Sequence, residues 1–218
     1  MDGASLLSIQ VGRVALLAPG AVPSAFVKHR VEGPIAVGML GLEGDEQADL
    51  RVHGGPDMAV YGYPAAHYDA WVDEYPEHRA AFVAGGVGEN FTISGMTEAD
   101  ACVGDVHRIG SATLQICQPR QPCFKFALRF ADNRLPKAMV RNGRSGWYYR
   151  VVETGIVVAG DAVACIERPH PTMSFKRLIE IVNIRKPSRG ELEAMAMMDG
   201  LAAALRVEAR RALALQTP

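Results

Sequence analysis

The stretch VGDVHRIGSATLQIC, residues 103–117, contains two short β-rich runs separated by a Gly-Ser pair. Such runs with a two-residue glycine break predict two antiparallel strands joined by a tight turn. In the second run, Ala112, Leu114 and Ile116 occupy alternate positions and therefore share one face of the strand. The stretch predicts a β-hairpin with an apolar face.

Short β-rich runs and glycine turns continue on both sides of this hairpin. Residues 9–17 are apolar and β-branched up to the Pro-Gly pair that follows them, and residues 155–165 give two further runs around Gly160. Many short strands divided by glycine turns are typical of a closed or partly closed barrel. The few expected helices are 64–75, whose first residue is a helix-compatible proline, and the weaker segments 124–130 and 136–141.

The composition changes after the Pro-His-Pro sequence at 169–171. Leu, Ala, Met, Glu and Arg, which are strong helix formers, replace the glycine-punctuated pattern. Ser188 followed by Glu191 is the signature of a capping box, and a third helix is expected over 201–215. The first helix is indicated by an apolar stripe with spacing i, i+3, i+4 and i+7: Phe175, Leu178, Ile179 and Val182.

Length and composition limit the classes of function. The 218 residues are 49% hydrophobic and carry 23 basic and 24 acidic side chains, so nucleic-acid binding through bulk electrostatics is disfavoured. No apolar run reaches the roughly 18 to 20 residues of a membrane helix, and Met1–Gln10 lacks the layout of a signal peptide. We therefore expect a cytoplasmic protein with no nucleic-acid or membrane partner. Its mostly β fold would comprise a barrel domain over 1–170 and a three-helix domain over 171–218.

Cys123 is the candidate reactive residue. It lies in QPRQPCFK, residues 118–125, where two prolines stiffen a loop and Arg120 and Lys125 flank the cysteine. Neighbouring cations favour the thiolate, which binds a soft metal or attacks an electrophile. No C-x-x-C pair of a zinc ribbon or thioredoxin motif is present. The remaining cysteines fit inert, buried, small apolar residues: Cys102, Cys117 and Cys165.

Three glycine-rich segments offer further polar or aromatic groups. GLEGDEQADLRVHGG, residues 41–55, is either a ligand-binding loop or a surface loop whose side chains satisfy its own backbone. GGVGENF, residues 85–91, lacks the last glycine of the dinucleotide-binding motif. It is either a tight turn or a segment in which Asn90 presents its amide to a ligand. NGRSGWYYR, residues 142–150, either stacks on a planar ligand or closes one end of the barrel.

Five runs cover most of residues 10–168: GLEGDEQADLRVHGGPDMAVYGYP, GVGENF, VGDVHRIG, QPRQPCFK and GRSGWYYRVVETGIVVAGD. Their order and spacing resemble the MOSC domain family, named after the C-terminal domains of molybdenum cofactor sulfurases. The small bacterial YiiM-like branch is the most similar part of the family, and the helical tail looks like that branch's C-terminal three-helix domain. One departure is Met58, because a lysine commonly follows the aspartate of HGGPD in this pattern.

The resemblance implies a MOSC-type β-barrel that binds the molybdenum cofactor through the pterin dithiolene and one protein cysteine. Carried to this chain, the metal ligand is Cys123, and His53 and Asn90 lie near the cofactor. His53 is the candidate catalytic acid, because the ordinary pKa of histidine lies near neutrality. The basic residues available to the pterin phosphate are Lys28, Arg51, Arg120 and Lys125.

The resemblance also implies an activity, namely the reduction of N-hydroxylated bases and related hydroxylamines to amines, which is a detoxification. Since the sequence carries no flavin, haem or iron–sulfur signature, we expect electrons from a separate flavin or iron–sulfur protein. Two alternatives stay open. One is a non-catalytic carrier of the cofactor, or of sulfur on Cys123. The other is a hydrolase with Cys123 as nucleophile and His53 as base.

Overall fold

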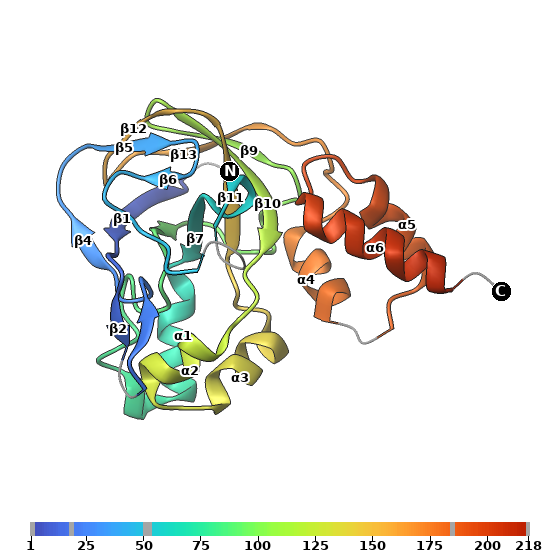
Figure 1. The fold of residues 1–218 in the computed structure, drawn as a ribbon. Coiled ribbons are helices and arrows are strands. Elements are labelled where there is room, and N and C mark those ends of the chain that lie inside the picture. Colours follow the sequence, from blue (N-terminus) through green and yellow to red (C-terminus); the bar gives the residue numbers. More distant parts are fainter. Residues whose placement is uncertain (1–2, 18–19, 50–53, 184–185, 217–218) are drawn as a thin grey trace.

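The computed structural model describes residues 3–17, 20–49, 54–183 and 186–216. Its main feature is an eight-stranded sheet in the order β13-β9-β10-β11-β7-β8-β1-β4, antiparallel except between β7 and β8 (Figure 1). The strands of this sheet are β1 (Ser5–Val11), β4 (His29–Val31), β7 (Val60–Pro64), β8 (Phe91–Ser94), β9 (Val106–Ile109), β10 (Ala112–Pro119), β11 (Trp147–Glu153) and β13 (Val163–Glu167). Two small sheets contain β12 (Gly155–Val157), β5 (Ile35–Gly38) and β6 (Gly41–Leu42), and β2 (Ala15–Leu17) with β3 (Val22–Ser24).

The hairpin expected over 103–117 is formed by β9 and β10. Ala112 pairs with Ile109 across the turn, as the Gly-Ser break predicts. The alternating residues Ala112, Leu114 and Ile116 are fully buried in the main core. Strand β10 pairs with β9 on one side and with β11 on the other, and its pairing with β11 continues to Pro119.

The large sheet curls toward closure. The start of β1 meets the segment that leads into β13 through a bridge between Ser5 and Ala162. Two backbone hydrogen bonds support it, from Leu6 N to Asp161 O at 2.8 Å and from Val163 N to Ala4 O at 2.9 Å. Within the described residues, the strand order nevertheless leaves β13 and β4 as edges, so no continuous ladder closes a barrel. The mostly β fold predicted from the sequence is confirmed.

One predicted run is divided in the structure, and the two runs expected around Gly160 belong to different sheets. The run 9–17 is split into β1 and β2 around Gly12, where a Cβ atom would lie 2.6 Å from the carbonyl oxygen of Ala25. This close approach of two backbones requires glycine and ends the strand. The two runs within 155–165 do not pair with each other. Instead, β12 pairs with β5, and β13 pairs with β9.

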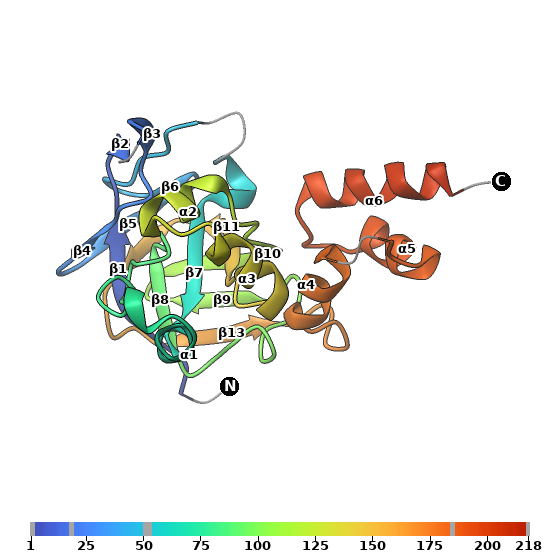
Figure 2. The same cartoon turned by 90° about the horizontal axis from the view of Figure 1, so that it is seen from below.

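A group of short helices covers one end of the sheet (Figures 1 and 2). Pro64 ends β7 rather than opening a helix, so α1 begins two residues later than predicted. An aromatic cluster packs these helices together, with the rings of Trp71 and Phe82 stacked 5.4 Å apart and Phe126 5.3 Å from Phe130. The helices are α1 (Ala66–Glu74), α2 (Phe124–Phe130) and α3 (Arg134–Asn142), with short 3-10 turns over Pro56–Met58 and Pro76–His78.

Three helices follow the sheet, as the composition predicts, and lie to one side of it in both views: α4 (Phe175–Asn183), α5 (Arg189–Met197) and α6 (Ala203–Leu215). The capping box is present, because the side chains of Ser188 and Glu191 each accept the other's backbone N–H. Helix α4 packs on the sheet through Phe175, whose ring lies 6.2 Å from that of Trp147. The main core is continuous from the sheet into this tail, and the boundary near residue 170 stays a prediction.

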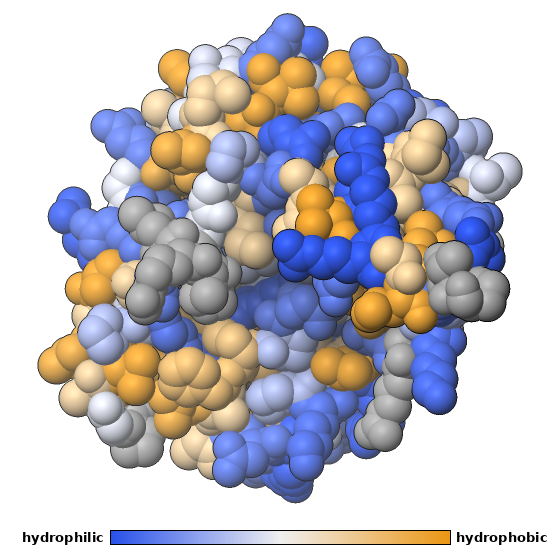
Figure 3. Space-filling model, turned by 45° about the vertical axis from the view of Figure 1, so that its right-hand side comes forward, coloured by the Kyte–Doolittle hydropathy of each residue, from blue (hydrophilic) through white to orange (hydrophobic). Residues whose placement is uncertain are grey.

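Figure 3 shows the face of the molecule that is turned toward the tail side. In Figure 3, apolar residues lie in scattered groups around a hollow whose floor is mainly hydrophilic. Among the described segments, no helix has the length and apolar character needed to cross a membrane.

Candidate functional site

Five of the seven predicted site residues line one pocket. The other two, Arg51 and His53, lie outside the described residues. The pocket is formed by segments that are far apart in the sequence: the loop before β4, the loop after β6, the start of β8 and the loop between β10 and α2. The predicted residues among its lining are Lys28, Asn90, Arg120, Cys123 and Lys125.

The proline loop after β10 delivers Cys123 to this pocket. Strand β10 ends at Pro119, and Cys123 is the N-cap residue of α2 with extended backbone angles, φ −110° and ψ 170°. Cys123 is partly exposed, whereas Cys102 and Cys117 are buried, as expected of inert cysteines. Cys165 differs from that expectation, because it is partly exposed on the edge strand β13. All four cysteines lie in described segments, and none forms a disulfide.

Arg120 is a buried cation held between two aromatic rings. Its guanidinium lies 5.1 Å from the ring centre of Phe26 and 4.9 Å from that of Tyr61, and it donates a hydrogen bond of 2.7 Å to Val87 O. Only 6% of the residue is exposed. Burial acts to lower the pKa of Arg120, but nearby Tyr61, Tyr148 and Cys123 raise it above its ordinary value. The side chain therefore stays charged, although none of the described carboxylates forms an ion pair with it.

Lys28 and Asp45 form a buried ion pair in the same pocket. Lys28 Nζ lies 2.5 Å from Asp45 Oδ1, and both side chains are less than 10% exposed, at 7% and 5%. Burial lowers the pKa of Lys28, and the charge of Asp45 opposes this shift. Asp45 Oδ1 also accepts a hydrogen bond from Gly12 N at 2.7 Å. The pair thus anchors the loop after β6 to the end of β1.

Asn90 uses its amide to hold the pocket wall. Its Nδ2 donates to Asp45 Oδ2 at 2.8 Å and to Gln10 O at 3.2 Å, while its Oδ1 accepts from Tyr61 N at 3.0 Å. Both amide hydrogens are therefore engaged by the protein, and Asn90 fixes the position of Asp45. The expectation that Asn90 also contacts a cofactor stays a prediction.

The pocket has an excess of positive charge. Lys125 is 9% exposed and, among the described residues, forms no ion pair, like Arg120. Lys28 is balanced by Asp45. Glu46 at the rim is already engaged, because its carboxylate accepts Val14 N at 2.7 Å. Two buried cations that have no anionic partner in the described part of the chain favour an anionic ligand, because burying an uncompensated charge is costly.

The two glycine-rich segments after β7 support the pocket. In 85–91, the buried carboxyl of Glu89 accepts hydrogen bonds from Tyr68 Oη and Gly85 N at 2.5 and 2.7 Å, so this segment is a tight turn. Burial raises the pKa of Glu89. In 142–150, Tyr148 lines the pocket, while Trp147 and Tyr149 are buried in the core.

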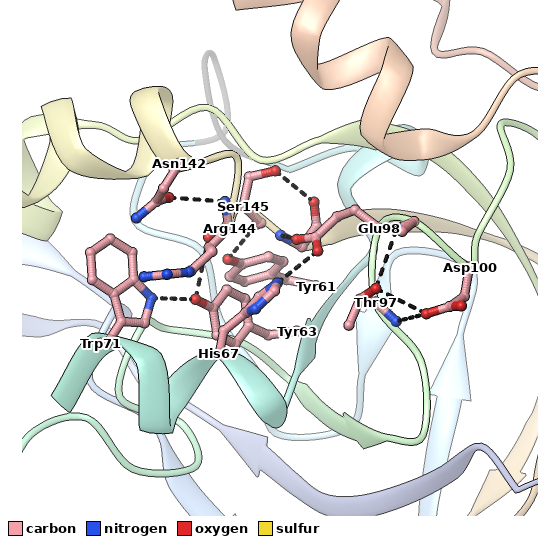
Figure 4. A network of polar contacts seen from close by, with 12 residues as sticks. Tyr61, Tyr63, His67, Trp71, Thr97, Glu98, Asp100, Asn142, Arg144 and Ser145 are labelled. Atoms are coloured by element: carbon pink, nitrogen blue, oxygen red, sulfur yellow. Dashed lines mark hydrogen bonds and ion pairs between the residues drawn. The ribbon is translucent and has the colours of Figure 1, made fainter. Parts of the chain in front are cut away.

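Figure 4 shows how hydrogen bonds fix the wall behind Tyr61. Tyr61 Oη donates to Ser145 O at 2.8 Å, and Tyr63 Oη donates to Arg144 O at 3.2 Å. His67 Nε2 lies 2.6 Å from Glu98 Oε2, and Gly146 N donates to Glu98 Oε1 at 2.7 Å. Glu98 thus connects α1 with the loop after α3. The loop after α3 is thereby fastened to α1 and β7, which holds the Tyr61 ring against Arg120.

Sequence reasoning missed the role of three of the pocket's contributors. Asp45 sits in the Gly-Asp step of the run 41–55, where the polar pattern drew attention to the loop but not to its role as the partner of Lys28. The aromatic residues Phe26 and Tyr61 carried no local signal, whereas Tyr148 lies in the segment 142–150 that the sequence analysis singled out as aromatic. Met58 also lines the pocket, so the position where the family pattern commonly has a lysine contributes an apolar side chain here.

The residues present fit a molybdenum cofactor. A thiol at the pocket lining is the donor type that binds soft metals. The two buried cations, which pair with no carboxylate of the described segments, suit a phosphate group, for which the fork of an arginine is well shaped. Aromatic rings next to them suit a planar heterocycle. Cys123 would hold the metal, and Arg120 and Lys125 would face the anionic groups.

Several known proteins are similar to this chain in sequence and in fold. The profile of the MOSC domain family matches residues 49–164. The chain is 42% identical over 150 residues to Protein YiiM of Escherichia coli, covering 69% of this chain and 67% of that protein. It is 35% identical over 185 residues to a protein of Gibberella moniliformis named Reductase, covering 84% of this chain but 33% of that longer protein. The crystal structure of YiiM from Geobacillus stearothermophilus superposes with a TM-score of 0.82 at 31% identity, covering 96% of this chain and 99% of the other.

Proposed function

The chain belongs to the MOSC domain family and is similar to YiiM, and from this premise we propose that it is a molybdenum-cofactor-dependent reductase of N-hydroxylated compounds. The observation that carries the proposal is a partly exposed cysteine, Cys123, in a pocket where two buried cations have no carboxylate partner among the described residues. The similarity to a protein named Reductase supports the reaction class.

Each pocket residue has a role in this proposal. Cys123 Sγ would be the protein ligand to molybdenum, and the charge of Arg120 favours its thiolate form. Arg120 and Lys125 would bind the anionic part of the cofactor. The Lys28–Asp45 pair, fixed by Asn90, would keep the opposite wall in place and exclude water from it.

When bound, the cofactor would supply a metal centre that donates two electrons to the substrate and takes the oxygen of its N–OH group. The overall reaction consumes two electrons and two protons, cleaves the N–O bond and yields an amine and water. A separate flavin or iron–sulfur protein would deliver the electrons. His53, in the segment outside the described residues, is the proposed proton donor.

The test is the variant Cys123→Ser, compared with Cys117→Ala, which removes a buried cysteine outside the pocket. Both proteins would be produced in a host that makes the cofactor, and their molybdenum content and reduction of 6-hydroxylaminopurine with an artificial electron donor would be measured. We expect Cys123→Ser to abolish turnover while the chain stays folded. Cys117→Ala should retain activity, with stability reduced by about 1 kcal/mol.

Two outcomes would decide between the proposal and its rival. Full activity of Cys123→Ser would refute the ligand assignment. Tight cofactor binding by the parent protein without any turnover would instead favour a non-catalytic carrier of the cofactor.

A further inference from the structure

A second group of potential metal ligands lies away from the pocket, on the strands at the β13 edge of the large sheet. Its members are Asp105, His107 and Cys165, and their ligating atoms lie within 4.8 Å of one another. His107 on β9 and Cys165 on β13 are direct partners in the strand register. Because cross-strand partners project to the same face of a sheet, the topology itself brings the imidazole and the thiol together. Asp105 immediately precedes β9, and its carboxylate lies within 4.8 Å of the other two ligating atoms.

One nitrogen of this group is buried and unpartnered. His107 is fully buried, and its Nδ1 lies 2.8 Å from Tyr149 Oη. Its Nε2 has no hydrogen-bond partner among the residues that the structure describes and lies 4.0 Å from Asp105 Oδ2. A buried polar atom without a partner costs about 1–3 kcal/mol. A ligand bound at His107 Nε2 would provide the interaction that this buried nitrogen lacks. Burial lowers the pKa of His107 to about 4, so its ring is neutral near pH 7.

The surroundings of the group are compatible with a cation. Asp105 is fully buried and forms an ion pair with Arg168, whose Nε and Nη2 lie 2.9 and 2.7 Å from its two oxygens. Arg168 is one-third exposed, at 33%, so it can move outward as a cation enters. Cys102 N also donates to Asp105 Oδ2 at 2.9 Å. With the Cys165 thiolate and the Asp105 carboxylate, two negative charges would face one arginine and the incoming ion.

We propose that Asp105, His107 and Cys165 form a binding site for a zinc-like divalent cation. One sulfur, one imidazole nitrogen and one carboxylate oxygen are the donors that Zn²⁺ takes in proteins, at about 2.0–2.3 Å. Tetrahedral ligation at these lengths requires the three atoms to draw together by less than about 1.5 Å from their present separations. Binding would replace the proton of the Cys165 thiol with the metal and release that proton to solvent. It would link the edge strand β13 to β9.

The test uses the metal alone and needs no enzyme activity. The parent for the test is Cys123→Ser, which removes the other partly exposed thiol. Co²⁺ would be titrated in while the absorption of thiolate-to-cobalt charge transfer and of tetrahedral Co²⁺ is recorded, and Zn²⁺ would then be added as competitor. We expect one equivalent of Co²⁺ to bind and to be displaced by Zn²⁺.

Three double variants, each with one further substitution added to Cys123→Ser, complete the experiment. Cys165→Ser should remove the charge-transfer band and weaken binding by at least about tenfold. Cys117→Ala, the matched buried cysteine, should leave both unchanged. His107→Gln should also weaken binding. His107 lies in the core, so His107→Gln can fail to fold. In that case the result for Cys165→Ser, at a partly exposed edge position, decides the test.

No cobalt band in the Cys123→Ser parent, or a band that survives Cys165→Ser, would overturn the proposal. Neither result bears on the reductase assignment, which depends on Cys123 and on turnover.

Discussion

Replacing Arg120 with methionine would separate a ligand-binding role from a structural one. Methionine keeps an unbranched apolar stem between the rings of Phe26 and Tyr61 but removes the charge. The cofactor-free protein would lose two cation–π contacts of about 0.5–2 kcal/mol each. It would also lose the hydrogen bond to Val87 O, whose carbonyl then stays unpaired at a cost of about 1–3 kcal/mol.

A gain opposes these losses, because the variant no longer buries a cation that lacks a carboxylate partner among the described residues. The dehydration penalty of such an ion is several kcal/mol. We therefore expect the free energy of unfolding of the cofactor-free protein to change by less than about 2 kcal/mol in either direction. Binding of an anionic ligand should suffer more. A hydrogen bond to a charged group is worth about 1.5–3 kcal/mol, so affinity should fall about 10- to 150-fold.

The assay combines urea unfolding of the cofactor-free protein with molybdenum content after purification from a cofactor-producing host. The matched control is Arg134→Met, since Arg134 also lies over an aromatic ring, that of Tyr75, but is exposed and paired with Asp132 and Glu77 outside the pocket. The control should retain molybdenum. If Arg120→Met instead lost more than about 3 kcal/mol of stability and kept its molybdenum, Arg120 would be a structural residue and our reasoning would be refuted.

Three further predictions concern the frame of the site. Gly88→Ala should destabilise the protein by about 1–3 kcal/mol in urea unfolding and lower molybdenum content, because φ is +87° there and a Cβ would lie 3.2 Å from the Phe26 ring. Glu89→Gln should flatten stability against pH. Burial raises the pKa of Glu89 above its ordinary 4.5, so the stability contributed by the protonated carboxyl is present below that pH and lost as pH rises through the folded value. A chain ending at Glu167 should lose most helical circular dichroism and unfold cooperatively at a lower midpoint, because α4 packs on the sheet.

Each of these has a contrary result. An unchanged Gly88→Ala protein would mean that the Phe26 ring is free to move aside. A Glu89→Gln protein whose stability follows pH as the parent does would show that Glu89 does not titrate on unfolding. A truncated chain without a cooperative transition would show that the sheet and the tail fold as one unit.

Local patterns were enough to predict the elements whose residues interact with near neighbours. The hairpin 103–117 depends on alternation and a two-residue turn, and the Ser188–Glu191 capping box depends on a spacing of three. The loop that presents Cys123 was readable because prolines and cations adjoin it in the sequence.

Features that depend on distant segments could not be read in this way. The pairing of Lys28 with Asp45 joins two loops, and the enclosure of Arg120 depends on rings from two other parts of the chain. The break of the first strand at Gly12 arises from the approach of Ala25, which no periodicity in 9–17 reveals. The exposure of Cys165 follows from the position of β13 at the sheet edge, which is a property of the strand order.

Strand β11 connects the pocket with the C-terminal helices. Trp147 and Tyr148 are consecutive, so their side chains project to opposite faces of the strand. Trp147 packs against Phe175 of α4. Tyr148 lies in the pocket wall beside Tyr61, and the centres of their two rings are 5.2 Å apart. The strand thus contacts the C-terminal helices through Trp147 and lines the pocket with Tyr148. The contact with α4 and the wall of the pocket are therefore separated by a single residue step along β11.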